Sequence, residues 1–202
     1  MTACVVIPIR SFEAGKSRLG TELDATRRAD LLRAMAHNVV AAAGSMPVAV
    51  VSNAGEVRQW ASELGLTVID DPGTLNLAAA AGLGWAAVAG HDRVVVAHAD
   101  LPLATSLAPV TADGRRPVVA AVPCHRDDGT PVLSLPTTAT NFVFAYGPGS
   151  FRRHAAAARA AGLAFRVRRD ARLGRDVDAP EDLAGLPVGL GEVARRRALL
   201  DA

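Results

Sequence analysis

The sequence predicts an α/β fold in which helices cover both faces of a mainly parallel central sheet. Short, continuous apolar runs rich in β-branched residues are typical of strands buried on both faces. Segments with apolar residues at helical spacing separate these runs in the first half of the chain. Half of the 202 residues are hydrophobic and only 4% are aromatic, so we expect a core built from alanine, valine and leucine.

Strands and helices are expected to alternate in the first half. The predicted strands are "CVVIPI" at 4–9, "VAVVSN" at 48–53, "LTVIDD" at 66–71 and "RVVVAHAD" at 93–100. The first helix is expected over 24–44, with Asp24 as its N-cap and Gly44 as its stop. Two more helices are expected over 56–65 and 75–90. Right-handed strand–helix–strand crossovers make these four strands parallel.

The second half is expected to add antiparallel or edge strands to the same sheet, because several of its strands follow one another without helices. The predicted strands are "PVVAAVPC" at 117–124, "TPVLSLP" at 130–136, "NFVFAYG" at 141–147 and "LAFRVRRD" at 163–170. Helices are expected over 149–162 and 179–186, the latter with Pro180 in its first turn. No linker or repeat marks a boundary, so residues 1–202 are expected to form one domain. Its helical tail, about 189–202, could pack on the domain itself or on a twin subunit, giving a homodimer.

Composition excludes several classes of protein. A formal net charge of +2 does not indicate a nucleic-acid or membrane-surface partner. Cys4 and Cys124 lie in apolar runs without metal-ligand spacing, and we expect buried free thiols in a reducing cytoplasm. The sequence shows no signal peptide and no membrane span, which also predicts a cytoplasmic protein. The arginines between 152 and 175 predict either a solvated face or an electrostatic funnel for an anionic substrate.

Polar residues gather where the predicted parallel strands end, and open α/β sheets bind their ligands at this edge. The residues in question are Arg10, Lys16 and Arg18 after the first strand, Asp70 and Asp71 after the third, Asp100 after the fourth, and Asp176 and Asp178 in a later loop. Carboxylates beside a basic loop suit a nucleoside triphosphate held through Mg²⁺, because Mg²⁺ binds one or two carboxylates together with phosphate oxygens.

Lys16 is the only lysine of the chain. It is either a solvated charge or a compact ammonium placed beside phosphate oxygens. The "GKS" at 15–17 is not a P-loop, because position 10 is arginine where that motif has glycine, and the predicted helix begins later. Neither a G-x-G-x-x-G nor a G-x-S-x-G motif is present.

Several motifs together resemble one family. "IPIRSFEAGKSRL", "DPGTLNLAAAAG", "ADLPL", "DGTPVLSL", "YGPGSFRRH" and "DVDAPEDL" occur in the order expected of the CofC/FbiD family, from about residue 5 to about 186. The resemblance implies a single-domain, Rossmann-like nucleotidyltransferase fold. It also implies a guanylyltransferase that transfers GMP from GTP to phosphoenolpyruvate or 2-phospho-L-lactate, with release of pyrophosphate, in coenzyme F420 biosynthesis.

The resemblance further implies which residues form the site. Mg²⁺ would be held by Asp100, Asp176 and Asp178. The phosphorylated acid would be bound by Thr130, Gly147 and Ser150. The residues expected at the nucleotide are Arg10, Lys16, Arg18, Asp71 and Asn76. Lys16, Arg18 and Asp100 are expected to act in catalysis.

Two other functions stay open on the sequence alone. One is a nucleotidyltransferase of the same fold that acts on another phosphorylated acceptor, either molybdopterin-like or a sugar phosphate. The other is a non-catalytic nucleotide-binding protein. The favoured prediction is an enzyme whose partners are GTP and a small phosphorylated acid. No nucleic-acid or membrane partner is predicted.

Overall fold

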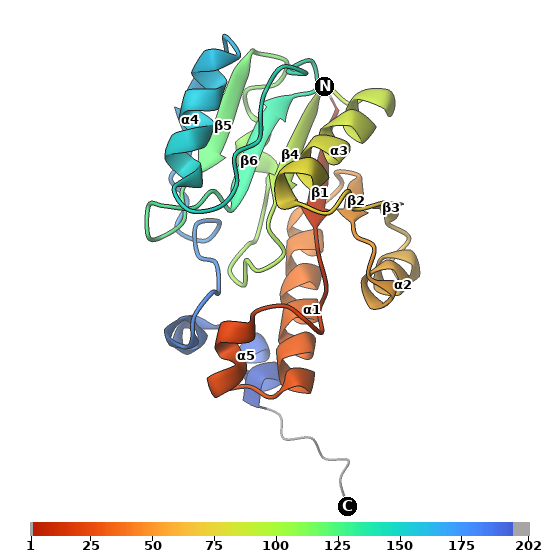
Figure 1. The fold of residues 1–202 in the computed structure, drawn as a ribbon, viewed down its shortest axis with the longest axis vertical. Coiled ribbons are helices and arrows are strands. Elements are labelled where there is room, and N and C mark those ends of the chain that lie inside the picture. The colour runs from red at the N-terminus through yellow and green to blue at the C-terminus, as the bar shows by residue number, and fades with distance from the viewer. Residues whose placement is uncertain (1, 196–202) are drawn as a thin grey trace, which may run out of the picture.

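Seven strands form one sheet in the computed structural model, which describes residues 2–195, in the order β3-β2-β1-β4-β6-β5-β7 (Figure 1). The strands are β1 (Ala3–Pro8), β2 (Val48–Val51), β3 (Thr67–Ile69), β4 (Arg93–Ala97), β5 (Val118–Val122), β6 (Val132–Pro136) and β7 (Ala164–Val167). Strand β6 runs antiparallel to both its neighbours, whereas the other pairings are parallel. The predicted mainly parallel sheet, with antiparallel pairing confined to the second half, is therefore confirmed.

The α-helices lie where the spacing of apolar residues in the sequence predicted helices. They are α1 (Ala25–Ala42), α2 (Gly55–Glu63), α3 (Leu75–Val88), α4 (Ser150–Ala160) and α5 (Val188–Arg195), with 3-10 helices η1 (Ser17–Thr21), η2 (Ala108–Thr111) and η3 (Pro180–Gly185). Asp24 caps α1 as predicted, because its Oδ1 accepts a hydrogen bond from the Arg27 N–H at 2.8 Å. Gly44, with φ of +62°, follows the end of the same helix. The sequence did not predict η1 and η2.

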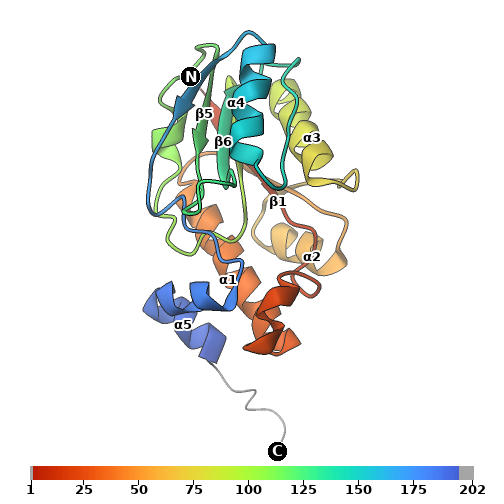
Figure 2. The same cartoon turned by 60° about the vertical axis from the view of Figure 1, so that its left-hand side comes forward.

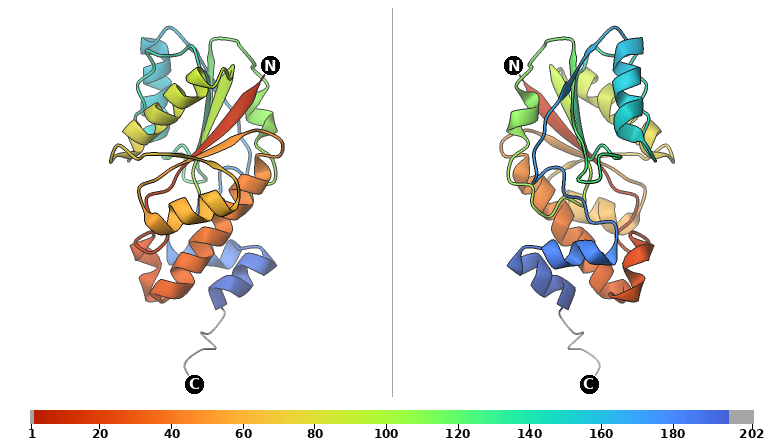
Figure 3. Two further views of the ribbon diagram at one scale, coloured as in Figure 1. Left: turned by 90° about the vertical axis from the view of Figure 1, so that its right-hand side faces the viewer. Right: turned by 90° about the vertical axis from the view of Figure 1, so that its left-hand side faces the viewer.

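Helices cover both faces of the sheet, as Figure 3 shows in two opposite views. Successive residues of a strand point to opposite faces, so Val5 and Ile7 pack on the side of α1 and α2. Cys4 and Val6 pack on the side of α3 and α4. Both faces of β1 are therefore buried, which explains its continuous apolar run.

The strand predicted at 141–147 is absent, and this prediction is wrong. The segment keeps the alternation of a strand, because Phe142, Phe144 and Tyr146 are buried while Val143 is 69% exposed. Its backbone bonds to side chains: Ala145 N–H donates to His154 Nε2 at 3.0 Å, and Tyr146 N–H donates to Asn76 Oδ1 at 2.6 Å. Its buried side chains pack in one hydrophobic cluster with α3, α4 and a face of the sheet, and the segment pairs with no strand of the sheet.

A cluster of helices extends the molecule beyond the sheet. Helix α1 runs from the sheet into this cluster, where α5 packs against α1 and η1 contacts η3 (Figures 1 and 2). The predicted helical tail begins as α5, and 196–202 lie outside the described residues. Across the described residues, no helix combines the length and apolar character needed to cross a bilayer.

Candidate active site

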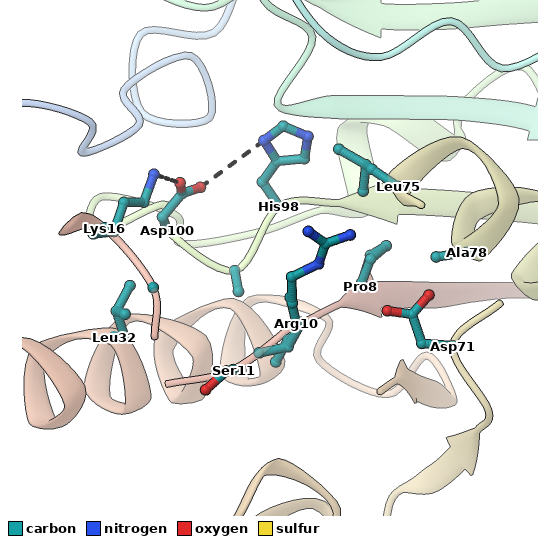
Figure 4. Close-up of a pocket in the computed structure, with 13 residues that line it drawn as sticks. Pro8, Arg10, Ser11, Lys16, Leu32, Asp71, Leu75, Ala78, His98 and Asp100 are labelled. Atoms are coloured by element: carbon teal, nitrogen blue, oxygen red, sulfur yellow. Dashed lines mark hydrogen bonds and ion pairs between the residues drawn. The ribbon is translucent and has the colours of Figure 1, made fainter. Parts of the chain in front are cut away.

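Two adjoining cavities lie at the carboxyl ends of β1 and β4. The first has a volume of about 370 Å³, and Figure 4 shows the side chains that line it. The second has a volume of about 490 Å³. The side chains that line both are Lys16, Leu75, His98 and Asp100. A ligand with two parts could therefore occupy both cavities and meet these four residues at their junction.

The Lys16 ammonium stands at this junction between two carboxylates. It donates to Asp100 Oδ2 and, at 2.5 Å, to Asp178 Oδ1. Burial opposes the charge of Lys16, but the two carboxylates outweigh burial and raise its pKa above the ordinary value. Its backbone has φ of 52° and ψ of 46°, a left-handed conformation that is uncommon outside glycine. The loop that enters η1 therefore holds the chain's one lysine in a restricted conformation over the acidic side chains.

Asp100 connects two parts of the chain that are distant in sequence. Its carbonyl accepts a hydrogen bond from the Val177 N–H at 3.2 Å, which places the loop of Asp176 and Asp178 beside the end of β4. Burial alone would raise the pKa of Asp100, but the charges of Lys16 and His98 hold it below the ordinary value. The pKa of Asp176 is raised by burial and then by the Asp100 and Asp178 charges.

Asp182, which the sequence did not single out, fixes this acidic loop. It is 3% exposed, and its Oδ2 accepts hydrogen bonds from the N–H groups of Asp178 and Ala179 at 2.9 and 3.0 Å. Arg126 donates to both Asp182 oxygens at 3.1 Å. Burial would raise the pKa of Asp182, but these hydrogen bonds keep it below the ordinary value. In the sequence, Asp182 is only one residue of the short helix predicted over 179–186.

The carboxylates fit a divalent cation bound together with phosphates. Asp100 Oδ1 and Asp176 Oδ1 are buried and receive no hydrogen bond from the described residues, although His125 Nδ1 lies 3.2 Å from the latter. Within residues 2–195, no group of three or more acidic, histidine or cysteine side chains forms a ready-made metal cage. The ammonium of Lys16 instead takes the position of a cation. Mg²⁺ needs no all-protein cage, since it completes its ligands with phosphate oxygens and water.

The first cavity contains three of the residues predicted at the nucleotide, Arg10, Lys16 and Asp71. Arg10 donates to the Gly73 carbonyl at 2.6 Å, and Asp71 Oδ1 accepts from the Gly73 N–H at 2.8 Å. Asn76 lines neither cavity, because its Oδ1 is bonded to the backbone of Tyr146. Its role at the nucleotide stays a prediction.

The second cavity contains the residues predicted for the acid together with further donors. Thr130, Gly147, Ser150 and Arg18 line it, as do the unpredicted Arg126 and Tyr146. Thr130 and Ser150 are buried, and Gly147 has φ of +108°, which favours glycine. The Tyr146 hydroxyl is buried without a hydrogen-bond partner in the described chain, and burial raises its pKa.

The arginines between 152 and 175 do not line either of these cavities. Arg166 and Arg168 pair with the buried carboxylate of Asp113, and Arg169 pairs with Asp127. These three arginines are therefore paired with acids, and the choice between a solvated face and a funnel for the whole segment stays a prediction. The thiols of Cys4 and Cys124 are free and buried, as expected.

Comparisons with known proteins point to one family of enzymes. A family model described as "Guanylyl transferase CofC like" matches residues 3–197. The chain is 35% identical to the phosphoenolpyruvate guanylyltransferase of Rubrobacter xylanophilus over 98% of this chain and 99% of that relative. It is 31% identical to the 2-phospho-L-lactate guanylyltransferase of Methanothermobacter thermautotrophicus over 91% of this chain and 83% of that relative.

A solved structure shows the same fold. The nucleotidyl transferase Mth528 of Methanothermobacter superposes with a TM-score of 0.66 at 15% identity, covering 95% of this chain and 98% of the other. At that identity the likeness concerns the fold, and it confirms the nucleotidyltransferase architecture implied by the sequence motifs.

Proposed function

The chain belongs to the family of CofC-like guanylyltransferases, and we propose that it transfers GMP from GTP to the phosphate of phosphoenolpyruvate or 2-phospho-L-lactate, with release of pyrophosphate. One observation carries this proposal: the two adjoining cavities share Lys16 and Asp100 at their junction. A place in coenzyme F420 biosynthesis, which the motifs imply, stays a prediction.

The first cavity suits the nucleoside of GTP. Its apolar walls include Ile9, Leu75 and Ala78, which can pack against a base. Asp71 supplies an acceptor for the N1–H and amino group of guanine, and Arg10 supplies a cation. A carboxylate that accepts from both of these groups selects guanine over a base that lacks the two donors.

The second cavity suits the phosphorylated acid. Thr130 and Ser150 supply hydroxyl groups, and Arg18 and Arg126 supply positive charge. Ser150 is also the first residue of helix α4, and N–H groups at a helix N-terminus favour anions. An acid bound here brings its phosphate toward the junction, where the α-phosphate of GTP would lie.

Asp100, Asp176 and Asp178 are the residues that would hold Mg²⁺, which when bound neutralises and polarises the phosphates. Lys16 then exchanges its two carboxylate partners for phosphate oxygens, and Arg18 adds a second charge beside the leaving pyrophosphate. Both side chains counter negative charge that grows as the bond to pyrophosphate breaks.

The chain needs no general base for this reaction. A phosphate monoester has a second pKa near ~6, so its oxygen is largely unprotonated at neutral pH. That oxygen forms the new bond to the α-phosphorus while the bond to the bridging oxygen breaks and pyrophosphate departs. The work of the protein is therefore to align two anions and to offset their repulsion.

Purified protein with Mg²⁺, GTP and each acid in turn tests the proposal. We expect a guanylylated acid, identified by its mass, and pyrophosphate release that depends on both substrates. Phosphoglycerate, a sugar phosphate and the other nucleoside triphosphates complete the panel. Nucleotide binding without pyrophosphate release for any acceptor would contradict the proposal and favour a binding protein.

Two variants test the acidic side chains, with a matched control. Asp100→Asn and Asp178→Asn remove charge without changing shape, and each should lower turnover about 100-fold or more, since electrostatic groups at a transition state contribute on this scale. Asp70→Asn is the control, because Asp70 is exposed, pairs with Arg58 and lines neither cavity. Full turnover in both active-site variants would refute the assignment.

A further inference from the structure

A chain of hydrogen bonds runs behind the second cavity from the backbone to a hydroxyl group. The Ala145 N–H donates to His154 Nε2 at 3.0 Å, and His154 Nδ1 lies 3.0 Å from Thr130 Oγ1. The Ser150 hydroxyl lies 3.3 Å from the same Thr130 oxygen. Thr130 and Ser150 line the cavity, whereas His154 does not.

The backbone determines which nitrogen of His154 carries the proton. An amide N–H can only donate, so Nε2 must be the unprotonated acceptor. The ring is fully buried, between Phe142 and Tyr146. Burial, and then the charges of Arg153 and His98, lower the pKa of His154 to about 4. The ring is therefore neutral at physiological pH, and its one proton lies on Nδ1 and points to Thr130.

The hydroxyls of Thr130 and Ser150 have one more hydrogen than their contacts within the protein use. The hydroxyls of Thr130 and Ser150 carry two hydrogens, and the contact between them uses one, whichever of the two donates. His154 uses neither of them, because its Nδ1–H donates to Thr130 and its Nε2 accepts from the Ala145 N–H. One hydroxyl hydrogen therefore stays available to a ligand. In the opposite tautomer the ring would accept that hydrogen, and the pair would have none to offer.

We infer that His154 is a positioning residue. By donating to Thr130, it leaves one hydroxyl of the Thr130–Ser150 pair free to donate a hydrogen bond to the anionic group of the acid. The inference rests on the proposed function, since it assigns this cavity to the acid. His154 acts only through Thr130 and touches no substrate. A hydrogen bond to a charged group changes affinity by about 10- to 100-fold, and this is the expected contribution.

Kinetics of three variants test the inference. His154→Leu removes both hydrogen bonds and should raise the KM for the acid about 10- to 100-fold, with little change in the KM for GTP. His154→Gln should recover much of this loss, because its amide can accept from Ala145 and donate to Thr130. In a Thr130→Val background, His154→Leu should have no further effect on the KM for the acid.

Val119→Ala is the matched control for stability. Val119 is fully buried in the same hydrophobic cluster as Phe142 and Tyr146, so its truncation should lower the melting temperature without changing the KM for the acid. An unchanged KM for the acid in His154→Leu, or an equal rise in both KM values, would overturn the inference.

Nitrogen NMR of the histidine rings decides the tautomer without any activity. We expect the spectrum to contain one ring that is protonated on Nδ1 and unprotonated on Nε2. The signals of this ring should be absent from the spectrum of His154→Gln. A proton on Nε2 would overturn the inference even in an active enzyme. Absence of guanylyl transfer by the wild-type protein would instead contradict the proposed function, and the ring spectrum would still support or overturn the role of His154.

Discussion

The Lys16 ammonium balances two of the carboxylates that line the second cavity, so its removal should change how the protein responds to Mg²⁺. Lys16→Met leaves Asp100 buried without its cation, and a buried group that loses its partner costs about 1–3 kcal/mol. We expect a lower melting temperature without Mg²⁺ and a larger rise on adding it than in the wild type. Thermal unfolding against Mg²⁺ concentration, without nucleotide, measures both effects.

Lys16→Arg is the matched control for this experiment. It keeps the positive charge, so its response to Mg²⁺ should stay close to that of the wild type. Equal shifts for all three proteins would mean that Lys16 does not take the place of a cation at these carboxylates.

The buried ring of His154 should make stability depend on pH. Its pKa falls from 6.5 in the unfolded chain to about 4 in the fold, so below pH 6.5 the unfolded state binds the proton more readily. Unfolding free energy should therefore decrease as the pH falls from 6.5 to 4, by roughly 3 kcal/mol in total. Denaturant unfolding of the wild type and His154→Gln across this range isolates the effect, and identical slopes would contradict it.

Single residues differ in how far the sequence could reveal them. Lys16 and Asp100 could be grouped from the sequence, because the ends of parallel strands lie at one edge of a sheet. Asp176 and Asp178, in a later loop, were assigned to the same metal as Asp100 by the resemblance to the family. His154 could not be assigned to the site from the sequence. A lone histidine in a helix does not indicate that it will contact Thr130, which lies in another part of the chain. Its role depends on a backbone N–H that points to it, and the segment that supplies this N–H was predicted to be a strand.

At the scale of elements, helix α3 lies unusually close to β1. A Cβ on Gly82 would stand 2.4 Å from Val6 Cγ1 and 2.9 Å from Cγ2, and Val6 is fully buried. Gly82→Ala should therefore destabilise the protein by about 1–3 kcal/mol, because the packed core must shift. This loss should appear even though alanine favours helices more than glycine does.

Gly84 offers the matched control in the same helix. Nothing lies within 4 Å of a Cβ placed there, so Gly84→Ala should stabilise the protein by about 0.5–1 kcal/mol. Denaturant unfolding compares the two variants. If both stabilise the protein equally, close contact between α3 and β1 is not what the Gly82 site requires.

The segment 142–146 depends on Asn76 for one of its backbone bonds. Asn76→Leu removes the acceptor of the Tyr146 N–H and should cost about 1–3 kcal/mol, whereas Asn76→Asp keeps the acceptor and most of the stability. Denaturant unfolding and the KM for GTP measure the two roles. An unchanged stability with a raised KM for GTP would favour the predicted nucleotide contact over a structural one.

This segment also shows why one strand prediction was wrong. Alternating aromatic residues predict burial of one face, and that burial is present. Alternation does not specify a partner strand, and here Asn76 and His154 accept the backbone hydrogen bonds that a strand would have accepted. The strands of the sheet itself were predictable, because apolar runs that are buried on both faces have few other uses.

In the whole molecule, the helices beyond the sheet hold both sides of the active site. Lys16 immediately precedes η1, and Asp178 lies two residues before η3. The two 3-10 helices contact each other, and α1 contacts η1 and α5 (Figure 2). The cation and its carboxylate partner are therefore placed by a helical cluster, while Asp100 is placed by the sheet.

A substitution in α5 should therefore change the site from a distance. Leu190 packs against the core cluster that contains the apolar face of α1, so Leu190→Glu should lower stability by about 1–3 kcal/mol. It should also raise the KM for GTP several-fold, because η1 and η3 lose part of their support. Glu192→Ala, on the exposed side of α5, should change neither. Val119→Ala should lower stability alone, so a Leu190→Glu protein with lowered stability and an unchanged KM for GTP would show that the cluster does not position Lys16.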